Sequence, residues 1–211
     1  MKSGYIEAIR LGFEKLSELN PEIVCSRTGC KYVPSLEPGI RQAEYHIPWL
    51  GEKRALSSGN QYEQILWLHY LTSEGTKHPT GKLIAYRDIP GALFYESKFE
   101  ARVVRPIVKC FGNNLSDLTA AGEKLTEKYA QTADQPGVKR ASFGDASVTI
   151  DILPYVPVTY IIWSGDDEMC AAGNVLFDET AAGWLSAEDL VVLASLGVYR
   201  LIELSKSLTI T

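Results

Sequence analysis

Three consecutive carboxylates, Asp166, Asp167 and Glu168, directly follow a strand-like apolar run that ends at Trp163, and Asp178 follows ten residues further on. Carboxylate oxygens are the ligands that hard cations prefer, and Mg²⁺ often needs only one or two of them together with substrate oxygens. The loop 166–178 therefore predicts a divalent-metal-dependent enzyme as one function. The alternating acids and central glycine of a calcium loop are missing.

The same carboxylates have two other interpretations. They could cap a helix or pair with Arg87, Arg102 or Arg105, or they could bind a cationic or hydrogen-bond-donating ligand. A pocket for such a ligand would need aromatic walls, and the tryptophans and tyrosines of this chain supply candidates, although most aromatic side chains are expected in the core.

The leading hypothesis is a ligand-binding or accessory domain without assigned catalytic residues. Its expected site is concave and brings the segment 163–178 together with Trp67, Tyr86 and Arg87. His46, which lies close to Tyr45 and Trp49, and His69 are the imidazoles that could contact a ligand. The candidate ligand-binding residues are His46, Trp67, His69, Tyr86, Arg87, Trp163, Asp166, Asp167, Glu168 and Asp178.

Charge is distributed unevenly along the 211 residues. Residues 141–199 hold nine Asp or Glu and no Lys, Arg or His, whereas residues 1–140 hold 19 basic and 16 acidic side chains. A third hypothesis is thus a protein–protein adaptor whose acidic face docks a basic partner. Because phosphate binding needs a concentrated basic face, nucleic acid is not an expected partner. The spacing of Arg102, Arg105 and Lys109 predicts one helical face, which we expect to lie opposite the acidic block.

Other chemistry has little support in the sequence. There is no phosphate loop, dinucleotide-binding glycine motif, nucleophile elbow or His-Glu-x-x-His. Cys25 and Cys30 lack a second cysteine pair at zinc-site spacing, so reduced thiols and a redox or metal role both stay open. The chain has no uninterrupted apolar stretch for a signal peptide or membrane span, which favours a cytoplasmic protein without membrane contact.

The elements that would position these residues follow from periodicity. Helices are predicted over residues 2–19, 61–71, 93–111 with a kink at Pro106, 115–129, and from Ser186 onward. Strands are predicted over residues 43–50, 82–87, 146–153 and 158–163, with two short strands within 23–33 around a turn at Thr28 and Gly29. This order lacks the strict alternation of a doubly wound sheet, so we expect an α+β fold, a mostly antiparallel sheet covered by helices, in a single domain over residues 1–211.

Four segments, residues 64–72, 83–91, 143–145 and 154–189, resemble the DUF3786 family of bacterial and archaeal proteins. The resemblance implies a single α+β domain but no activity. Some members look like fusions to a small iron–sulfur domain in organisms that live without oxygen, which implies an iron–sulfur or redox protein as partner. It also suggests a tetrapyrrole or corrinoid as ligand, held by aromatics and His46 or His69. Met169 and Cys170 replace the aromatic residue and proline of the family pattern.

Overall fold

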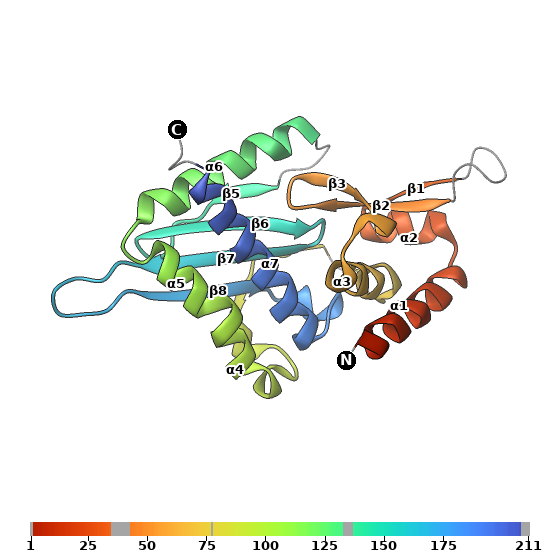
Figure 1. The fold of residues 1–211 in the computed structure, drawn as a ribbon, viewed down its shortest axis with the longest axis horizontal. Coiled ribbons are helices and arrows are strands. Elements are labelled where there is room, and N and C mark those ends of the chain that lie inside the picture. The colour runs from red at the N-terminus through yellow and green to blue at the C-terminus, as the bar shows by residue number, and fades with distance from the viewer. Residues whose placement is uncertain (1, 35–42, 77, 133–136, 208–211) are drawn as a thin grey trace.

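Two antiparallel sheets organise the chain, as a computed structural model that describes residues 2–34, 43–76, 78–132 and 137–207 shows (Figure 1). The smaller sheet has the order β1 (Lys31–Val33), β2 (Glu44–Trp49) and β3 (Glu52–Ala55). The larger sheet has the order β4 (Leu83–Ala85), β8 (Ala172–Asp178), β7 (Val156–Trp163), β6 (Ala146–Leu153) and β5 (Val138–Arg140). The α+β prediction is confirmed.

Seven helices accompany these sheets in the described part of the chain. Helices α1 (Lys2–Ser17), α2 (Pro21–Thr28) and α3 (Gln61–Thr72) lie with the smaller sheet. Helices α4 (Glu96–Phe99), α5 (Arg105–Phe111), α6 (Leu115–Thr132) and α7 (Ala187–Lys206) lie with the larger one (Figure 1). Short 3-10 turns span Leu56–Ser58, Tyr86–Asp88, Ala92–Phe94 and Ala181–Gly183. None of the described helices is long and apolar enough to cross a membrane.

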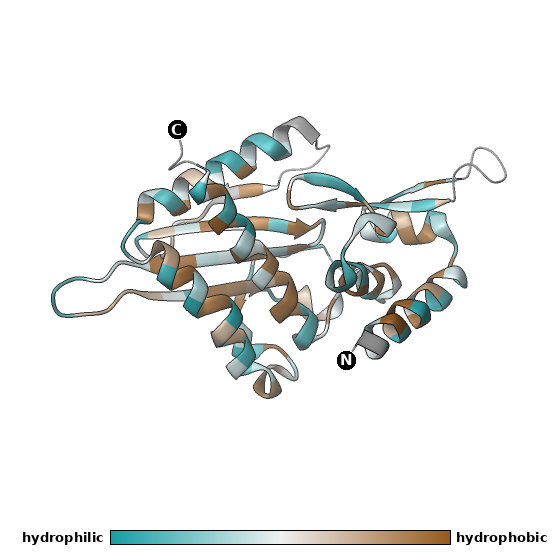
Figure 2. Ribbon diagram, in the orientation of Figure 1, coloured by the Kyte–Doolittle hydropathy of each residue, from teal (hydrophilic) through white to brown (hydrophobic). Residues whose placement is uncertain are grey.

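One hydrophobic core runs through both sheets. Strands β6 and β7 and helix α7 carry long hydrophobic stretches where the helix crosses the larger sheet (Figure 2). The contact is close, because the Tyr160 hydroxyl donates a 2.8 Å hydrogen bond to the Ala194 carbonyl and a Cβ at Gly197 would lie 2.1 Å from the same hydroxyl. Helix α7 therefore fits this sheet only where a glycine faces it.

Of the two short strands predicted within residues 23–33, the second is present as β1, but the first is wrong because α2 occupies that part of the segment. The Asn20 side chain accepts hydrogen bonds from the backbone N–H groups of Glu22 and Ile23, and Pro21 occupies the first helical turn. Both features favour a helix start. Gly29, at φ 71°, ends the helix in the left-handed conformation before β1 begins.

The helix predicted over residues 93–111 is interrupted. A π-helical turn spans Glu100–Val104, and the Arg105 N–H reaches back to the carbonyl of Glu100. Pro106 has no N–H and its ring crowds the preceding turn, so a regular α-helix cannot pass through this point. Strands β5 and β8 complete the larger sheet and were not predicted.

Candidate functional site

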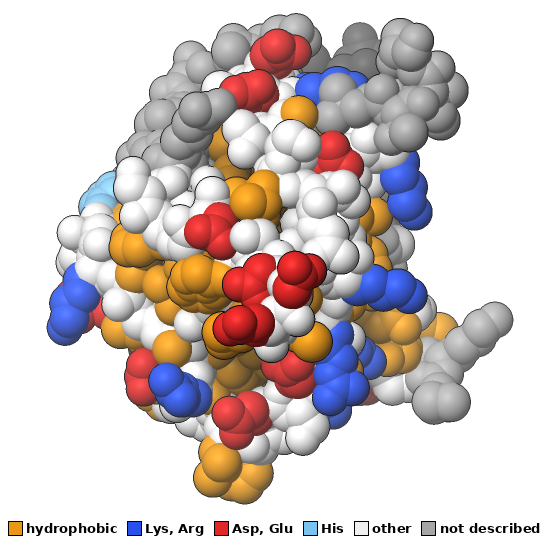
Figure 3. Space-filling view, turned by 90° about the vertical axis from the view of Figure 1, so that its left-hand side faces the viewer, with side chains coloured by type: hydrophobic (Ala, Val, Ile, Leu, Met, Phe, Trp, Pro, Cys, Tyr) orange, Lys and Arg blue, Asp and Glu red, His pale blue; other side chains and the backbone are white. Residues whose placement is uncertain are grey.

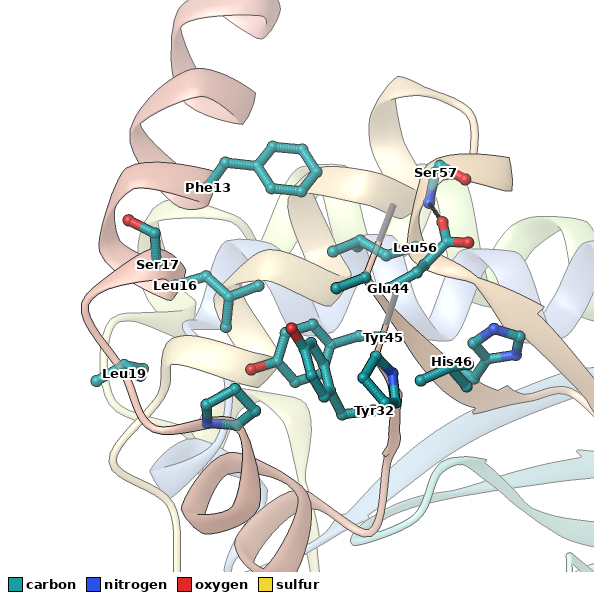
Figure 4. Close-up of a pocket in the computed structure, with 14 residues that line it drawn as sticks. Phe13, Leu16, Ser17, Leu19, Tyr32, Glu44, Tyr45, His46, Leu56 and Ser57 are labelled. Carbon is teal, nitrogen blue, oxygen red and sulfur yellow. Dashed lines mark hydrogen bonds between the residues drawn. The ribbon is translucent and has the colours of Figure 1, made fainter. Parts of the chain in front are cut away.

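A cavity of about 1090 Å³ lies between α1 and the smaller sheet (Figure 4). This is near the upper end of the range of small-molecule sites, roughly 300–1,000 Å³. Residues 35–42, which connect β1 to β2, lie outside the described part of the chain. The described walls of the cavity are Phe13, Leu16, Ser17, Leu19, Pro21, Tyr32, Val33, Pro34, Ala43, Glu44, Tyr45, His46, Leu56 and Ser57.

Two tyrosines form one wall of this cavity. Tyr32 of β1 and Tyr45 of β2 are direct partners in the antiparallel ladder, so their side chains share one face of the sheet. Their ring centroids are 5.0 Å apart. Neither hydroxyl has a hydrogen-bond partner among the described residues. Three described side-chain atoms are both fully buried and unpartnered, and the two hydroxyls are not among them: Arg27 Nε, Trp67 Nε1 and Arg200 Nε. Solvent or a ligand can therefore reach both hydroxyls.

Burial raises the pKa of Tyr45 to about 12, with smaller contributions from Cys25, Tyr32 and Cys30. Tyr45 is thus protonated at neutral pH and able to donate a hydrogen bond. Cys25 and Cys30 lie near this tyrosine, and burial raises the pKa of both thiols, that of Cys30 to about 12. Protonated thiols are weak nucleophiles and poor metal ligands.

Glu44 and His46 line the cavity from the other face of β2. The Glu44 carboxylate accepts a 2.9 Å hydrogen bond from the Ser57 N–H, which fixes it beside Leu56. Figure 4 shows the tyrosine rings on the side of Leu16 and the imidazole of His46 turned away from them. His46 is therefore the one predicted ligand-binding residue at this cavity, and it lies at the edge.

The second histidine and the tryptophan of α3 lie elsewhere. His69 is on the surface, with its side chain 48% exposed, and its Nδ1 is 2.9 Å from the Asp189 carboxylate. Trp67 is fully buried and meets Trp49 edge to face, with centroids 5.4 Å apart. A fully buried indole cannot line a site, so Trp67 belongs to the core.

Tyr86 and Arg87 share a much smaller cavity of about 200 Å³ beside the π-helical turn. The Tyr86 ring stacks on Phe99 at a centroid distance of 4.0 Å, and its hydroxyl donates to the Ala187 carbonyl at 3.0 Å. Tyr86 is consequently held in the core, while Arg87 is exposed.

The acidic triplet lies at the tip of the hairpin between β7 and β8, which projects beyond the rest of the sheet (Figures 1 and 3). All three carboxylates are exposed. The Asp166 carboxylate accepts hydrogen bonds from the N–H groups of Glu168 and Met169 at 2.9 and 2.7 Å, and these bonds lower its pKa.

The predicted concave site is present only in part. Gly173 and Asn174 of β8 line the small cavity together with Tyr86 and Arg87. The acidic triplet, which the long hairpin carries outward, and the buried Trp67 do not line it.

Asp178 is at the opposite end of β8. The strand rises about 3.3 Å per residue, so the triplet and Asp178 are roughly 20 Å apart and cannot share one ion. The buried Asp178 carboxylate accepts hydrogen bonds from the Gly81 N–H at 2.7 Å and from the Thr180 N–H and hydroxyl at 3.0 and 2.8 Å. Burial alone would raise its pKa, but these bonds lower it. Among the described residues, no three His, Cys, Asp or Glu side chains are grouped to hold a metal ion.

The basic residues predicted to face the acidic block are not paired with it in the described part of the chain. Arg105 lies 3.5 Å from Glu100 instead, and the one ion pair between this helical region and the acidic block is Lys98 with Glu188, also at 3.5 Å. Figure 3 shows Lys and Arg side chains beside the acidic tip. The exposed carboxylates of the tip thus keep their charge available to solvent or a partner.

Sequence reasoning missed Tyr32, Tyr45, Glu44 and the apolar face of α1 that completes the cavity. The available signal was the alternation of Tyr45, Ile47 and Trp49 along β2, which marks the inward face of a strand. Tyr32 could be recognised as the partner of Tyr45 only from the register of β1 with β2.

These features define a two-sheet α+β domain with an apolar, tyrosine-bearing cavity in its smaller part. Residues 20–200 match the family described as Domain of unknown function (DUF3786), and the chain belongs to this family. No curated protein and no solved structure matches the chain.

Proposed function

We propose that this protein is a binding domain for a largely apolar, ring-containing small molecule, which occupies the cavity between α1 and the smaller sheet. The observation that supports this most is the pair of neighbouring tyrosines, Tyr32 and Tyr45, whose hydroxyls have no hydrogen-bond partner in the described part of the chain and which line a cavity of about 1090 Å³. Ligand sites combine apolar walls with a few polar groups in fixed positions, and this cavity has both.

A tetrapyrrole or corrinoid is the specific candidate from the sequence. The cavity volume and the position of His46 at its edge support that choice, because an imidazole can contact a macrocycle through a ring nitrogen. His69 is engaged with Asp189 and lies outside this cavity, so it is not part of the proposed site.

The experiment is thermal unfolding with hemin, cobalamin and a panel of divalent ions, because a ligand that binds only the folded state raises stability by mass action. The variant Ser17→Trp places a large ring in the cavity, and Glu18→Trp adds the same ring on the same helix outside the lining. We expect stabilisation by a macrocycle that Ser17→Trp removes and Glu18→Trp keeps, and that His46→Ala weakens. Equal behaviour of the two tryptophan variants, or no stabilisation by any compound, would contradict the proposal.

A second candidate is the adaptor function, which the projecting tip of the β7–β8 hairpin supports. Its three carboxylates are exposed, and none of them forms an ion pair in the described residues. A basic surface, such as that of an iron–sulfur or other redox protein, would be the partner. Binding to such a protein that falls steeply with salt, and that Asp167→Asn with Glu168→Gln weakens, would favour this function.

A further inference from the structure

We infer that the part of the ligand held in the cavity is an uncharged ring with a carbonyl or equivalent hydrogen-bond acceptor directed at Tyr32 and Tyr45, so that any carboxylates of a macrocycle would lie outside the cavity. This inference rests on the proposed function and specifies the chemistry of its ligand. It follows from three properties of the walls: the type of polar atom they present, their charge, and the position of their apolar side chains.

The polar atoms at the tyrosine wall are donors. Two phenol hydroxyls on neighbouring rings offer two O–H groups to one acceptor or to two neighbouring acceptors, and neither has a hydrogen-bond partner among the described residues. A polar group that leaves water without gaining a hydrogen bond loses free energy. A ligand without an acceptor would therefore bury these hydroxyls unfavourably, whereas a carbonyl oxygen would satisfy them.

The charge of the walls favours a neutral ligand. Glu44 is the only Asp, Glu, Lys or Arg among the described lining residues. An anionic ligand would enter an apolar space that already contains one carboxylate, without a described cation to offset its desolvation. The uncharged carbonyl avoids this penalty and still accepts from the tyrosines.

The apolar side chains favour a ring. Phe13 and Leu16 of α1, with Leu56, lie across from the tyrosine rings (Figure 4). A flat ring between the tyrosines and α1 buries apolar surface on both sides, and its carbonyl then lies at the edge where the hydroxyls are. Most of the binding free energy would come from this burial, and hydrogen bonds from the hydroxyls would make ring compounds with an acceptor bind more tightly than those without one.

Three small probes separate these properties: 1-tetralone, tetralin and 2-naphthoate. Tetralone and tetralin have nearly the same shape and differ in one carbonyl, and naphthoate is an anion of similar size. Affinities are measured by ligand-observed NMR titration of the wild-type protein. Since one or two hydrogen bonds of this kind contribute about 1 kcal/mol each, we expect tetralone to bind about 5- to 30-fold more tightly than tetralin.

The double variant Tyr32→Phe with Tyr45→Phe should remove this difference and leave tetralin affinity unchanged. The matched control is Tyr5→Phe with Tyr62→Phe, a tyrosine pair with centroids 5.3 Å apart that lies outside the cavity lining. Circular dichroism checks folding. Should the variant at buried Tyr45 fail to fold, Tyr32→Phe alone at the more exposed partner is expected to reduce the difference.

The outcomes distinguish the two proposals. Equal affinity of tetralone and tetralin for the wild-type protein would overturn the inference and leave the binding function standing. Tighter binding of naphthoate would overturn it in favour of an anionic ligand. Absence of binding by every probe, together with no macrocycle stabilisation that Ser17→Trp removes, would overturn the proposed function itself.

Discussion

The Nδ1 atom of His69 on α3 lies 2.9 Å from Oδ1 of Asp189 in the first turn of α7. The other oxygen of the same carboxylate accepts hydrogen bonds from the Ser186 hydroxyl at 2.6 Å and from the Ser186 N–H at 3.3 Å. One carboxylate thus closes the N-terminus of α7 and joins it to α3, the central helix of the smaller part. The pair contributes to stability in a pH-dependent way.

The hydrogen bond with Asp189 raises the pKa of His69 in the folded protein above its ordinary value of 6.5. The stability that protonated His69 contributes is therefore complete below pH 6.5 and is lost as the pH rises through the higher folded-state pKa. Burial alone would raise the pKa of Asp189, but the bonds from His69 and Ser186 lower it below 3.8, so its contribution is lost as pH falls through that lower value. We predict that His69→Gln destabilises the protein by about 0.5 kcal/mol at pH values above the folded-state pKa of Asp189 and below 6.5, after allowance for solvent screening.

The measurement is urea denaturation of wild type and His69→Gln from about pH 5 to about pH 9, a range in which the difference between them should shrink. His78→Gln is the control, because His78 is exposed and has no carboxylate partner in the described residues. A difference for His69→Gln that stays constant across this range would contradict an ionic contribution.

Asp178→Asn should destabilise the protein by about 1–3 kcal/mol, because the buried carboxylate accepts three hydrogen bonds and an amide cannot accept all of them equally well. Glu179→Gln, at the exposed neighbour that pairs with Lys82 at 2.7 Å, should leave stability nearly unchanged. Denaturant midpoints of both variants give the comparison. If Asp178 served a metal instead, its replacement would matter only in the presence of divalent ions.

Gly197→Ala should destabilise by about 1–3 kcal/mol, since its Cβ would lie 2.1 Å from the Tyr160 hydroxyl and 2.8 Å from Ile152 Cδ1. Gly183→Ala is the matched control, because nothing lies within 4 Å of a Cβ there. Thermal unfolding would measure both changes. Similar melting temperatures for the two variants would mean that α7 can move away from the sheet.

Arg200→Ala should cost about 1–2 kcal/mol because it removes a link between helix α7 and strand β3 of the smaller sheet. The guanidinium, 16% exposed, lies 2.7 Å from Glu52 of β3 and 2.7 Å from Glu203 of α7. Arg10 of α1 also bonds two carboxylates, Glu7 and Glu14, but is 51% exposed, so Arg10→Ala should leave stability nearly unchanged. Chemical denaturation in low and high salt tests both, and equal losses would contradict a role for burial.

Much of the fold could be predicted from local signals. The apolar periodicity of α3 and α7 and the Ser186 cap of α7 agree with the structure. The errors have local causes as well: Ile23 and Val24 favour a strand by propensity, but the Asn20 cap and Pro21 start a helix. Strand β8 contains Gly173 and Asn174, which have low strand propensity, and it forms because β7 and β4 pair with it on either side.

The site was harder to predict than the fold. His46 was placed correctly in a strand and lies at the cavity, but Tyr32 and Tyr45 meet only through a register that local sequence does not reveal. The acidic triplet was a strong pattern, and its place on a projecting hairpin depends on how far β7 and β8 extend past β6. Asp178 was predicted to share a site with the triplet because it follows closely in the sequence, but strand β8 lies between them and places them at opposite ends of the strand.

The projecting hairpin also affects how copies of the protein meet. Past the pairing of Ala146 with Ile162, β7 and β8 pair once more, Trp163 with Ala172, and the Ser164 N–H then donates to the Asp145 carboxylate before the chain turns back. The hairpin also carries Trp163 and Met169, which are 40% and 71% exposed. Exposed apolar side chains on a projecting hairpin favour contacts between copies, and like charges at its end oppose that association. We expect the exposed carboxylates of Asp166, Asp167 and Glu168 to oppose such contacts between copies by charge repulsion.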